Sequence, residues 1–273
     1  MSVFRPSAHA LITGGASGVG YAVARLCLAH SMRVSIVDSN QSSLDIARKN
    51  LSGDVKCIQA DVSSRSDWAS IRQQVGLDVD LLMLNAGVGG KGTWGDEDYF
   101  DKILATNLGG VVNGLNAYVP SFKERAEMEG KEGKGEGKSA IVITGSKQGI
   151  TNPPGNPAYN ASKAAVKTLA EHLSFDLKDT GVGVHLLVPG WTFTGLVSCA
   201  SSFYQFPTAK TSFSQETSQA QPKRNQKVRG RPTKWLNTCT PRCRTRNSTS
   251  SVPMTRSQKR RIRSACCGVL EIS

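Results

Sequence analysis

The feature that most constrains this chain is an alternation of short apolar runs with longer segments of helical period. The runs are predicted strands: His9–Ile12, Arg33–Asp38, Val55–Ala60, Asp80–Asn85, Ala140–Thr144 and Gly183–Val188. The predicted helices between them are Tyr21–His30, Gln41–Asn50, Ser64–Val75, Asp98–Arg125 and Ala158–Thr180. Leu81–Leu84 is continuously apolar, as in a parallel strand that is covered on both faces. The alternation predicts an α/β fold with a doubly wound parallel sheet.

A glycine-rich turn, Thr13–Gly20, joins the first predicted strand to the first predicted helix. Glycines at this place let the backbone turn tightly and approach a pyrophosphate, whose charge the helix N-terminus meets. Asp38 closes the second strand, where a carboxylate can bind the ribose hydroxyls of NAD. Each feature by itself also fits an ordinary turn and a surface aspartate. Together they predict a Rossmann-like dinucleotide site.

The charge of Asp38 also bears on which dinucleotide binds. A carboxylate repels the 2′-phosphate of NADP, and no Lys or Arg stands at positions 39–43 to offset that repulsion. The sequence therefore favours NAD over NADP.

A second motif opens the last long predicted helix. Tyr159 and Lys163 are four residues apart, so they share one face of that helix. A phenol with a pKa of about 10 is a poor acid or base at neutral pH. A neighbouring ammonium favours the phenolate and lowers the phenol's pKa towards a useful value. Taken alone, such a pair is more often part of a solvated helix face.

From Ala8 to about Leu196, the order of these and other motifs resembles the short-chain dehydrogenase/reductase family, of the classical type and with a fungal character. The matching positions are Thr13–Gly20, Asp61 and Val62, Asn85–Gly87, Asn107, Ser146, Tyr159–Lys163 and Pro189–Thr192. The resemblance implies an NAD(P)-dependent oxidoreductase that transfers a hydride between the cofactor and a secondary alcohol or ketone, including those of secondary metabolism.

The resemblance also assigns roles to individual residues. Tyr159 would be the general acid or base, and Ser146 would polarise the substrate oxygen. Lys163 would lower the pKa of the tyrosine and hold the nicotinamide ribose, while Asn107 would keep a water in the proton relay. The implied cofactor contacts are Gly14, Ser17, Val19, Gly20, Asp38, Asp61, Val62, Asn85, Ala86, Gly87, Tyr159, Lys163, Pro189 and Thr192.

Two further questions stay open at the level of the sequence. Trp94, Phe193 and Lys147 are candidate substrate contacts, although each also fits a packing or solvated role. A non-catalytic dinucleotide-binding protein is the alternative function. The complete set of Asn107, Ser146, Tyr159 and Lys163 argues against it, because a binding module needs neither hydroxyl.

The chain departs from the family after Leu196, where members would supply a substrate-covering loop, a last helix and strand, and a subunit interface. Residues 1–196 form the predicted NAD(P)-binding catalytic core and carry as many basic as acidic side chains, so the whole net charge of +13 belongs to residues 197–273. That tail is rich in Ser, Thr, Lys and Arg and has no sustained apolar period, so it is predicted to be poorly ordered.

Three interpretations of the tail compete. Lys259–Arg263 could serve nucleic-acid binding or nuclear import. A metal site built from Cys239, Cys243, Cys266 and Cys267 fits no common zinc spacing, so no metal is expected. The favoured interpretation is a retained intron near Val197 followed by a shifted reading frame.

Codon arithmetic supports the frameshift. Read from the third base of each codon, Thr233–Pro241 can encode V-V-E-Y-M-Y-P, and Arg246–Arg256 can encode E-F-Y-I-L-C-P-D-D-E. Both strings resemble the last helix and strand of fungal members of the family. In addition, Val197 and Ser198 can be spelled as an intron donor site.

Location and partners follow from simpler features. No run of eighteen apolar residues predicts a membrane span. Met1–Ala10 lacks the apolar core of a signal peptide, and Cys27 and Cys57 are isolated in the core, so a reducing cytoplasmic location is expected. The expected partner is a small-molecule alcohol or ketone. A nucleic-acid partner is not favoured, and the homo-oligomer usual in the family is doubtful for this chain.

Overall fold

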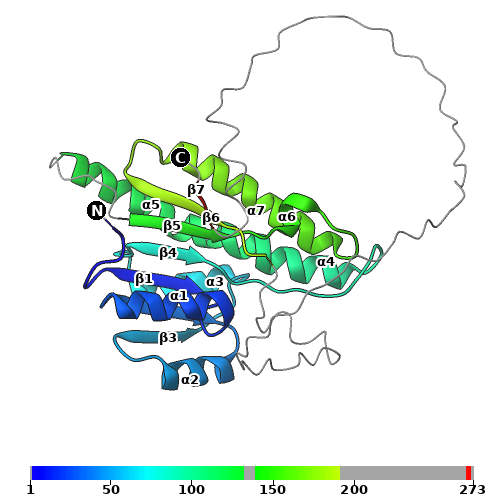
Figure 1. Ribbon diagram of the computed structural model, residues 1–273, viewed down its shortest axis with the longest axis horizontal. Coiled ribbons are helices and arrows are strands. Elements are labelled where there is room, and N and C mark those ends of the chain that lie inside the picture. The colour runs from blue at the N-terminus through cyan, green and yellow to red at the C-terminus, as the bar shows by residue number, and fades with distance from the viewer. Residues whose placement is uncertain (1, 132–138, 191–268, 272–273) are drawn as a thin grey trace, which may run out of the picture. The chain divides into compact units, whose positions relative to one another are not determined.

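The computed structural model describes residues 2–131, 139–190 and 269–271 (Figure 1). Within these ranges the strands form one sheet in the order β3-β2-β1-β4-β5-β6-β7. Their bounds are β1 His9–Thr13, β2 Arg33–Asp38, β3 Val55–Gln59, β4 Leu81–Leu84, β5 Ser139–Thr144, β6 Val182–Leu187 and β7 Val269–Glu271. Strands β1 to β6 pair in parallel. The predicted doubly wound parallel sheet is therefore confirmed.

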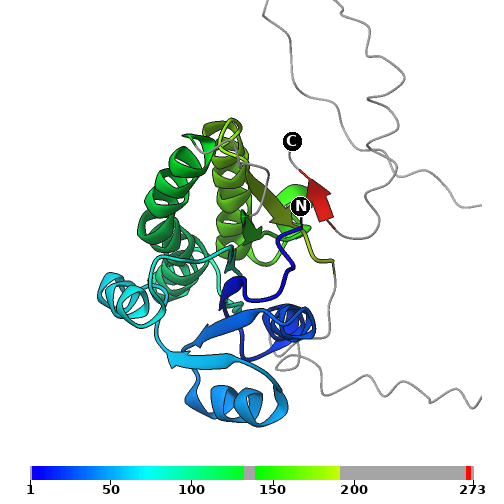
Figure 2. The same cartoon turned by 90° about the vertical axis from the view of Figure 1, so that its left-hand side faces the viewer.

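Helices cover both faces of this sheet (Figure 2). Their bounds are α1 Gly18–Ala29, α2 Gln41–Asn50, α3 Arg65–Val75, α4 Glu97–Leu104, α5 Gly110–Lys131, α6 Gln148–Thr151 and α7 Pro157–Asp176. One core cluster joins one face of the sheet to α3, α5 and α7, and the other joins the opposite face to α1 and α2. The first face of the β1 strand contributes Leu11, and the second contributes Ala10 and Ile12. β4 is a continuous apolar run because both of its faces are buried.

The strand order changes direction between β1 and β4, which are neighbours in the sheet although β2 and β3 intervene in the chain. In such sheets the loops that leave the carboxyl ends of these two strands run apart and open a crevice. The glycine-rich turn leaves β1, and residues 85–96 leave β4, so both segments meet at this switch point.

The predicted helix Asp98–Arg125 is interrupted in the structure. Between α4 and α5 the backbone forms a π-helical turn, η1, over Ala105–Gly109. Single π-helical turns are rare and are frequent at functional sites. This one carries Asn107, which is fully buried.

The tail and the edge beside β6 differ from the expectation in one respect. The sequence predicts no strand after Val188, yet β7 pairs antiparallel with His185, Leu186 and Leu187 of β6. The other residues of the predicted tail lie outside the described residues, as do the four cysteines and the basic run discussed above. Among the described helices, none has the length and apolar character needed to cross a membrane.

Candidate active site

The conformation of the glycine-rich turn depends on a left-handed glycine and on one close backbone approach. Gly14 has a φ of 62°, which L side chains rarely adopt. A Cβ added to Gly20 would lie 2.3 Å from the Gly14 carbonyl oxygen, so the first turn of α1 sits directly on the β1–α1 turn. Ser17 precedes α1 in an extended conformation, and its side chain does not cap the helix. This arrangement leaves the N-terminal amides of α1 available, so it fits the pyrophosphate of a dinucleotide.

Asp38 joins the end of β2 to the same turn. Its Oδ2 accepts a hydrogen bond from the Ala16 amide at 3.3 Å, and its Oδ1 accepts one from the Asn40 amide at 3.1 Å. The carboxylate is half-buried and lies beside the helix N-terminus. The structure therefore brings the predicted ribose-binding acid to the predicted pyrophosphate turn.

Thr13 and Asn85 connect the ends of three strands. Thr13 Oγ1 accepts hydrogen bonds from the amides of Asn85 and Ala86, at 2.9 and 3.1 Å. Asn85 Nδ2 donates to the carbonyls of Thr13 and Gly14, and Asn85 Oδ1 accepts from Thr144 Oγ1. The sequence analysis identified Asn85 and Ala86, placed Thr13 in the glycine-rich turn without a role of its own, and did not single out Thr144. A threonine directly before a glycine-rich turn was the available signal.

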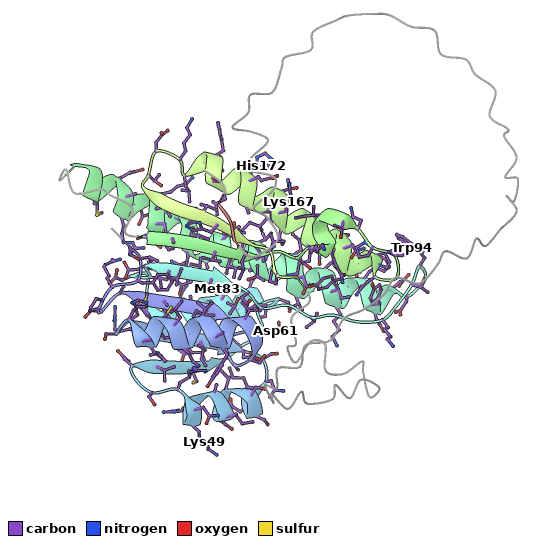
Figure 3. The ribbon with its side chains drawn as sticks, in the orientation of Figure 1. Lys49, Asp61, Met83, Trp94, Lys167 and His172 are labelled. Atoms are coloured by element: carbon purple, nitrogen blue, oxygen red, sulfur yellow. The ribbon has the colours of Figure 1, made fainter. Side chains whose placement is uncertain are left out.

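Asp61 and Val62 follow β3 at the same edge of the sheet, where Figure 3 shows Asp61. The Asp61 amide donates to Asp67 Oδ2 at 2.8 Å, and this bond lowers the pKa of the Asp67 carboxyl. The Val62 carbonyl accepts from Trp68 Nε1 at 2.8 Å and from Asn113 Nδ2 at 3.2 Å. These bonds fix the backbone of the segment that would flank the adenine.

Asn107 holds the segment after β4 against α7. Its Oδ1 accepts from the Val88 amide at 2.7 Å, and its Nδ2 donates to the Val88 carbonyl at 3.0 Å. The same Nδ2 donates to Ser162 Oγ at 3.2 Å. A Cβ added to Gly87 would lie 3.2 Å from Asn107 Oδ1, so Gly87 packs beside this amide. Ser162, which the sequence analysis missed, is the link between Asn107 and the helix that carries Tyr159.

Lys163 is a buried cation. Its side chain is 5% exposed, and Nζ donates to the Thr144 carbonyl at 2.8 Å. Nζ also lies 5.8 Å from the centroid of the Tyr159 ring. Burial disfavours the charged form and lowers the pKa of the Lys163 ammonium to about 8.

Tyr159 and Ser146 meet across the site. Burial raises the pKa of the Tyr159 phenol above its usual value, and its hydrogen bond with Ser146 acts in the opposite direction. The predicted effect of Lys163 on this pKa stays a prediction, since burial and Ser146 are the causes of the shift in this structure. Desolvation is the larger influence, and Thr144 is the partner of the Lys163 ammonium. The i, i+4 placement of Tyr159 and Lys163 is as predicted.

The short helix α6, which the sequence did not predict, positions Ser146. The Gln148 amide donates to Ser146 Oγ at 3.2 Å. A Cβ added to Gly149 would lie 2.5 Å from the Lys163 backbone carbon, so α6 packs closely on α7. Ser146 is therefore held against the helix that carries the tyrosine and the lysine.

The remaining predicted residues divide into described and undescribed ones. The Pro189 carbonyl accepts from the Lys147 amide at 3.2 Å, which places Pro189 beside the segment after β5. Trp94 and the Lys147 side chain are exposed. Thr192 and Phe193 lie outside the described residues. The structure thus brings together Asn107, Ser146, Tyr159 and Lys163 at one end of the sheet.

A doubly wound sheet with a glycine-rich turn at its switch point is typical of the class of dinucleotide-binding proteins. Residues 8–204 match the short chain dehydrogenase family. The chain belongs to this family, and with it to the NAD(P)-dependent dehydrogenases and reductases that act on alcohols and ketones.

Individual relatives and solved structures are similar over the same part of the chain. The 3beta-hydroxysteroid dehydrogenase 2 of Eggerthella lenta is 31% identical over 68% of this chain and 72% of its own length. The oxidoreductase asL5 of Sarocladium schorii is 30% identical over 66% and 70%. A short chain dehydrogenase/reductase of Burkholderia phymatum, solved in complex with NAD, is 30% identical with a TM-score of 0.64, over 72% of this chain and 70% of that one.

Proposed function

We propose that this protein is an NAD-dependent oxidoreductase that interconverts a secondary alcohol and a ketone, with Tyr159 moving the proton. The observation that carries the proposal is the convergence of Ser146 on Tyr159, which shares one face of α7 with the buried Lys163. When bound, the nicotinamide dinucleotide supplies or accepts the hydride.

In the proposed mechanism, the residues divide the work on one substrate oxygen. Tyr159 Oη gives its proton to that oxygen in ketone reduction and takes the hydroxyl proton in alcohol oxidation. Ser146 Oγ donates a hydrogen bond to the same oxygen and stabilises the charge that develops there. Lys163 would hold the nicotinamide ribose. Asn107 positions residue Val88 and Ser162, and would keep a water for the proton relay.

The cofactor would lie along the carboxyl edge of the sheet. Gly14, Ser17, Val19 and Gly20 would hold its pyrophosphate, and Asp38 would bind the adenosine ribose. Asp61 and Val62 would flank the adenine, and the segment Asn85–Gly87 would line the nicotinamide side with Pro189 and Thr192.

Asp38 supports NAD over NADP because its carboxylate would face the 2′-phosphate without a basic residue at positions 39–43. Isothermal titration of the protein with NADH and NADPH tests this preference. We expect tighter binding of NADH, and Asp38→Ser should narrow the difference. Tighter binding of NADPH by the unaltered chain would contradict the proposal.

The Tyr159→Phe variant tests the catalytic assignment. It removes one oxygen, so turnover of a ketone found in a metabolite screen should fall by at least about a thousandfold, near the upper part of the range for general acid–base catalysis. NADH affinity should stay the same, because the ring is kept. Unchanged turnover would refute the role of Tyr159. Absence of turnover in the unaltered protein, with NADH bound normally, would favour the non-catalytic dinucleotide-binding alternative.

We also propose that the catalytic core ends near residue 196 and that residues 197–273 reflect a retained intron and a shifted frame. The end of the family match at residue 204 supports this boundary. Such a chain would lack the family's last helix and turn over slowly, and limited proteolysis should stop near Leu196. A transcript whose uninterrupted coding sequence matches this protein, together with a protease-resistant tail and ordinary turnover rates, would overturn the proposal. The expected location is the cytoplasm.

A further inference from the structure

Trp94 is a large aromatic side chain that is mostly exposed to solvent. It is 77% exposed, the largest exposed fraction among the big hydrophobic side chains of the described residues. It stands in the segment between β4 and α4, beyond the carboxyl ends of the strands (Figure 3). Ligands of doubly wound sheets bind at this edge. An exposed indole at this place points to a contact with a ligand.

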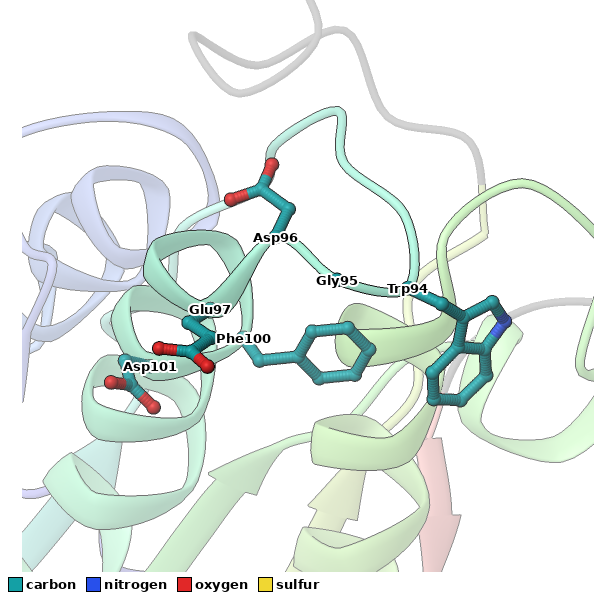
Figure 4. A pocket seen from close by; sticks show the side chains of 6 residues that line it. All are labelled: Trp94, Gly95, Asp96, Glu97, Phe100 and Asp101. Atoms are coloured by element: carbon teal, nitrogen blue, oxygen red, sulfur yellow. The ribbon is translucent and has the colours of Figure 1, made fainter.

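A series of side-chain contacts links Trp94 to the candidate acid/base. The Phe100 ring projects towards Trp94 (Figure 4), and the two ring centroids are 5.3 Å apart. Phe100 packs against a cluster formed by Tyr99, Ile103 and Ala158, and Tyr159 packs against the same cluster. Trp94 is therefore continuous with the aromatic packing around the reacting phenol.

Trp94 lines two hollows that differ in the charge of their other lining residues. One, of 480 Å³, is lined by Trp94 and Phe100 together with the carboxylates of Asp96, Glu97 and Asp101 (Figure 4). The other, of 320 Å³, has no charged lining residue. We call the second one the proline hollow. Its walls include Thr93, Trp94, Pro153, Pro154, Pro157 and Asn160. An uncharged ring system fits the proline hollow better, because it leaves no carboxylate desolvated.

The walls of the proline hollow are held to one another. Tyr99 Oη donates a hydrogen bond to Asn156 Oδ1, which joins α4 to the residue before α7. Asn160 Nδ2 donates to the Pro153 carbonyl at 2.7 Å. A Cβ added to Gly92 would lie 2.2 Å from Tyr99 Cγ, so the segment before Trp94 rests on the Tyr99 ring. The hollow is therefore formed before any ligand enters, as most small-molecule sites are.

The position and size of the hollow limit what it can bind. Asn160 follows Tyr159 in α7, but successive side chains of a helix do not share a face. The link between the hollow and Tyr159 is the cluster of Tyr99, Ile103 and Ala158, on which both Phe100 and Tyr159 pack. The volume lies at the small end of the range of about 300–1,000 Å³ for ligand pockets. Indole and proline rings offer flat, apolar faces, against which another ring packs with a large contact area.

We propose that the proline hollow binds the ring system of a cyclic ketone or alcohol, and that Trp94 determines the preference for cyclic over acyclic substrates. This inference rests on the proposed function, because the carbonyl of a ring held in the hollow must reach Tyr159 to be reduced. Trp94 is then a specificity-determining residue and takes no part in proton transfer.

The test compares 2-tetralone, a bicyclic ketone, with butan-2-one, a small acyclic one, using the full-length protein and NADH. For Trp94→Ala we expect the KM for 2-tetralone to rise at least tenfold, with kcat and the kcat/KM for butan-2-one changed less than twofold. Trp94→Phe keeps an aromatic face and should recover most of the loss. The matched control is Phe175→Ala, which truncates another exposed aromatic, 67% exposed, near the far end of α7.

Binding measured without turnover separates this inference from the proposed function. Saturation-transfer NMR of 2-tetralone with the NADH-loaded protein should give a signal that Trp94→Ala abolishes and Phe175→Ala retains. If this dependence is seen while neither ketone is reduced, the inference stands and the proposed function fails. If 2-tetralone does not bind, or if Trp94→Ala affects both ketones equally or neither of them, the inference is overturned.

Discussion

At the ends of β1, β2 and β4, polar side chains find partners within the chain, whereas at the end of β5 and the start of α7 buried polar groups keep few. Thr13 Oγ1 accepts from two amides, and the Asn85 carboxamide uses both its nitrogen and its oxygen. The Lys163 ammonium has three N–H groups. Among the described residues it donates one hydrogen bond, to the Thr144 carbonyl. Gln148 Oε1, close to Ser146, is buried without a partner among those residues.

This difference indicates two kinds of site on one edge of the sheet. The dinucleotide half, at the ends of β1, β2 and β4, is a backbone conformation that side-chain hydrogen bonds stabilise. Cofactor binding there requires a closely packed backbone. The catalytic half lies at the end of β5 and the start of α7. The catalytic half keeps hydrogen-bonding capacity that the chain does not use, at a cost in stability, for a substrate oxygen and a ribose. The predictions below are arranged to break or sharpen this distinction, beginning with the largest effect.

Gly20→Ala should disrupt the close packing of the glycine-rich turn against the first turn of α1. The added Cβ would lie 2.3 Å from the Gly14 carbonyl oxygen, so the turn or the helix must move. Overpacking of this kind costs about 1–3 kcal/mol, and we expect NADH affinity measured by isothermal titration to fall by about 100-fold. Gly90→Ala is the control, because its added Cβ meets only side-chain atoms at 3.6 Å or more. NADH affinity retained in Gly20→Ala would show that the turn is not close-packed.

Lys163→Met should stabilise the protein while it removes activity. A pKa lowered from 10.5 to about 8 corresponds to about 3 kcal/mol of unfolding free energy lost to burial of the charge. Both states hold the proton below pH 8, so the full penalty is present at pH 7. Between pH 8 and 10.5 the unfolded chain binds more protons than the folded one, so stability rises with pH.

Chemical denaturation at several pH values checks this prediction. At pH 7 the variant should be more stable by about 2–3 kcal/mol, once the donor lost to the Thr144 carbonyl is included. The gap should close between pH 8 and 10.5. Lys167→Met is the matched control, since Lys167 lies one turn further along the same helix, is partly exposed and pairs with Glu171 (Figure 3). A destabilised Lys163→Met variant with no pH-dependent gap would contradict the distinction between the two halves.

Thr13→Val should lower the free energy of unfolding, whereas Lys163→Met should raise it. Valine fills the same space but leaves the amides of Asn85 and Ala86 without the oxygen that accepts their hydrogen bonds. Because Thr13 is 2% exposed, water does not replace that oxygen, and we expect a loss of about 2 kcal/mol in the same denaturation experiment. Thr13→Ser, which keeps the oxygen, serves as the control. A variant as stable as the unaltered protein would mean that these bonds do not hold the dinucleotide half together.

The pH dependence of turnover should change the rate of alcohol oxidation by up to about tenfold per pH unit, with no change in the sequence. Alcohol oxidation needs the Tyr159 phenolate, and the pKa of this phenol is raised by burial. The rate of oxidation should therefore rise from pH 7 to 9, whereas ketone reduction, which uses the phenol, should be nearly constant. A plateau in oxidation below pH 8 would show that the pKa is lowered in the working enzyme, as the sequence predicted.

Much of this fold follows from the sequence because its signals are local. The β1–β6 strands lie within a residue or two of the predicted runs. The signal is clearest for the central β1 and β4 strands, which are buried along their whole length. The spacing of Tyr159 and Lys163 likewise fixes their shared helix face. Those features need no knowledge of the rest of the chain.

The features that the sequence missed depend on partners far away in the chain. The π-helical turn at Asn107 is held by bonds to Val88 and Ser162, which lie 19 and 55 residues away. The direction of the Tyr159 pKa shift depends on burial, and helix period cannot measure burial. β7 is only three residues long and pairs with a distant strand, so no periodicity predicts it.

The π-helical turn has a consequence for how the chain tolerates changes in length. Such a turn holds one residue more than the α-helix around it, which rotates everything that follows about the helix axis. Tyr99 and Ile103 before the turn pack with Ala158, whereas Val111, Tyr118 and Phe122 after it pack in the core beneath the sheet. Deleting one residue between Ala105 and Gly109 would restore a regular helix but turn one of these two apolar stripes towards water. The extra residue therefore sets the rotation of α5 relative to α4 about the helix axis. Its removal should be harder to accommodate than a longer deletion in an exposed loop.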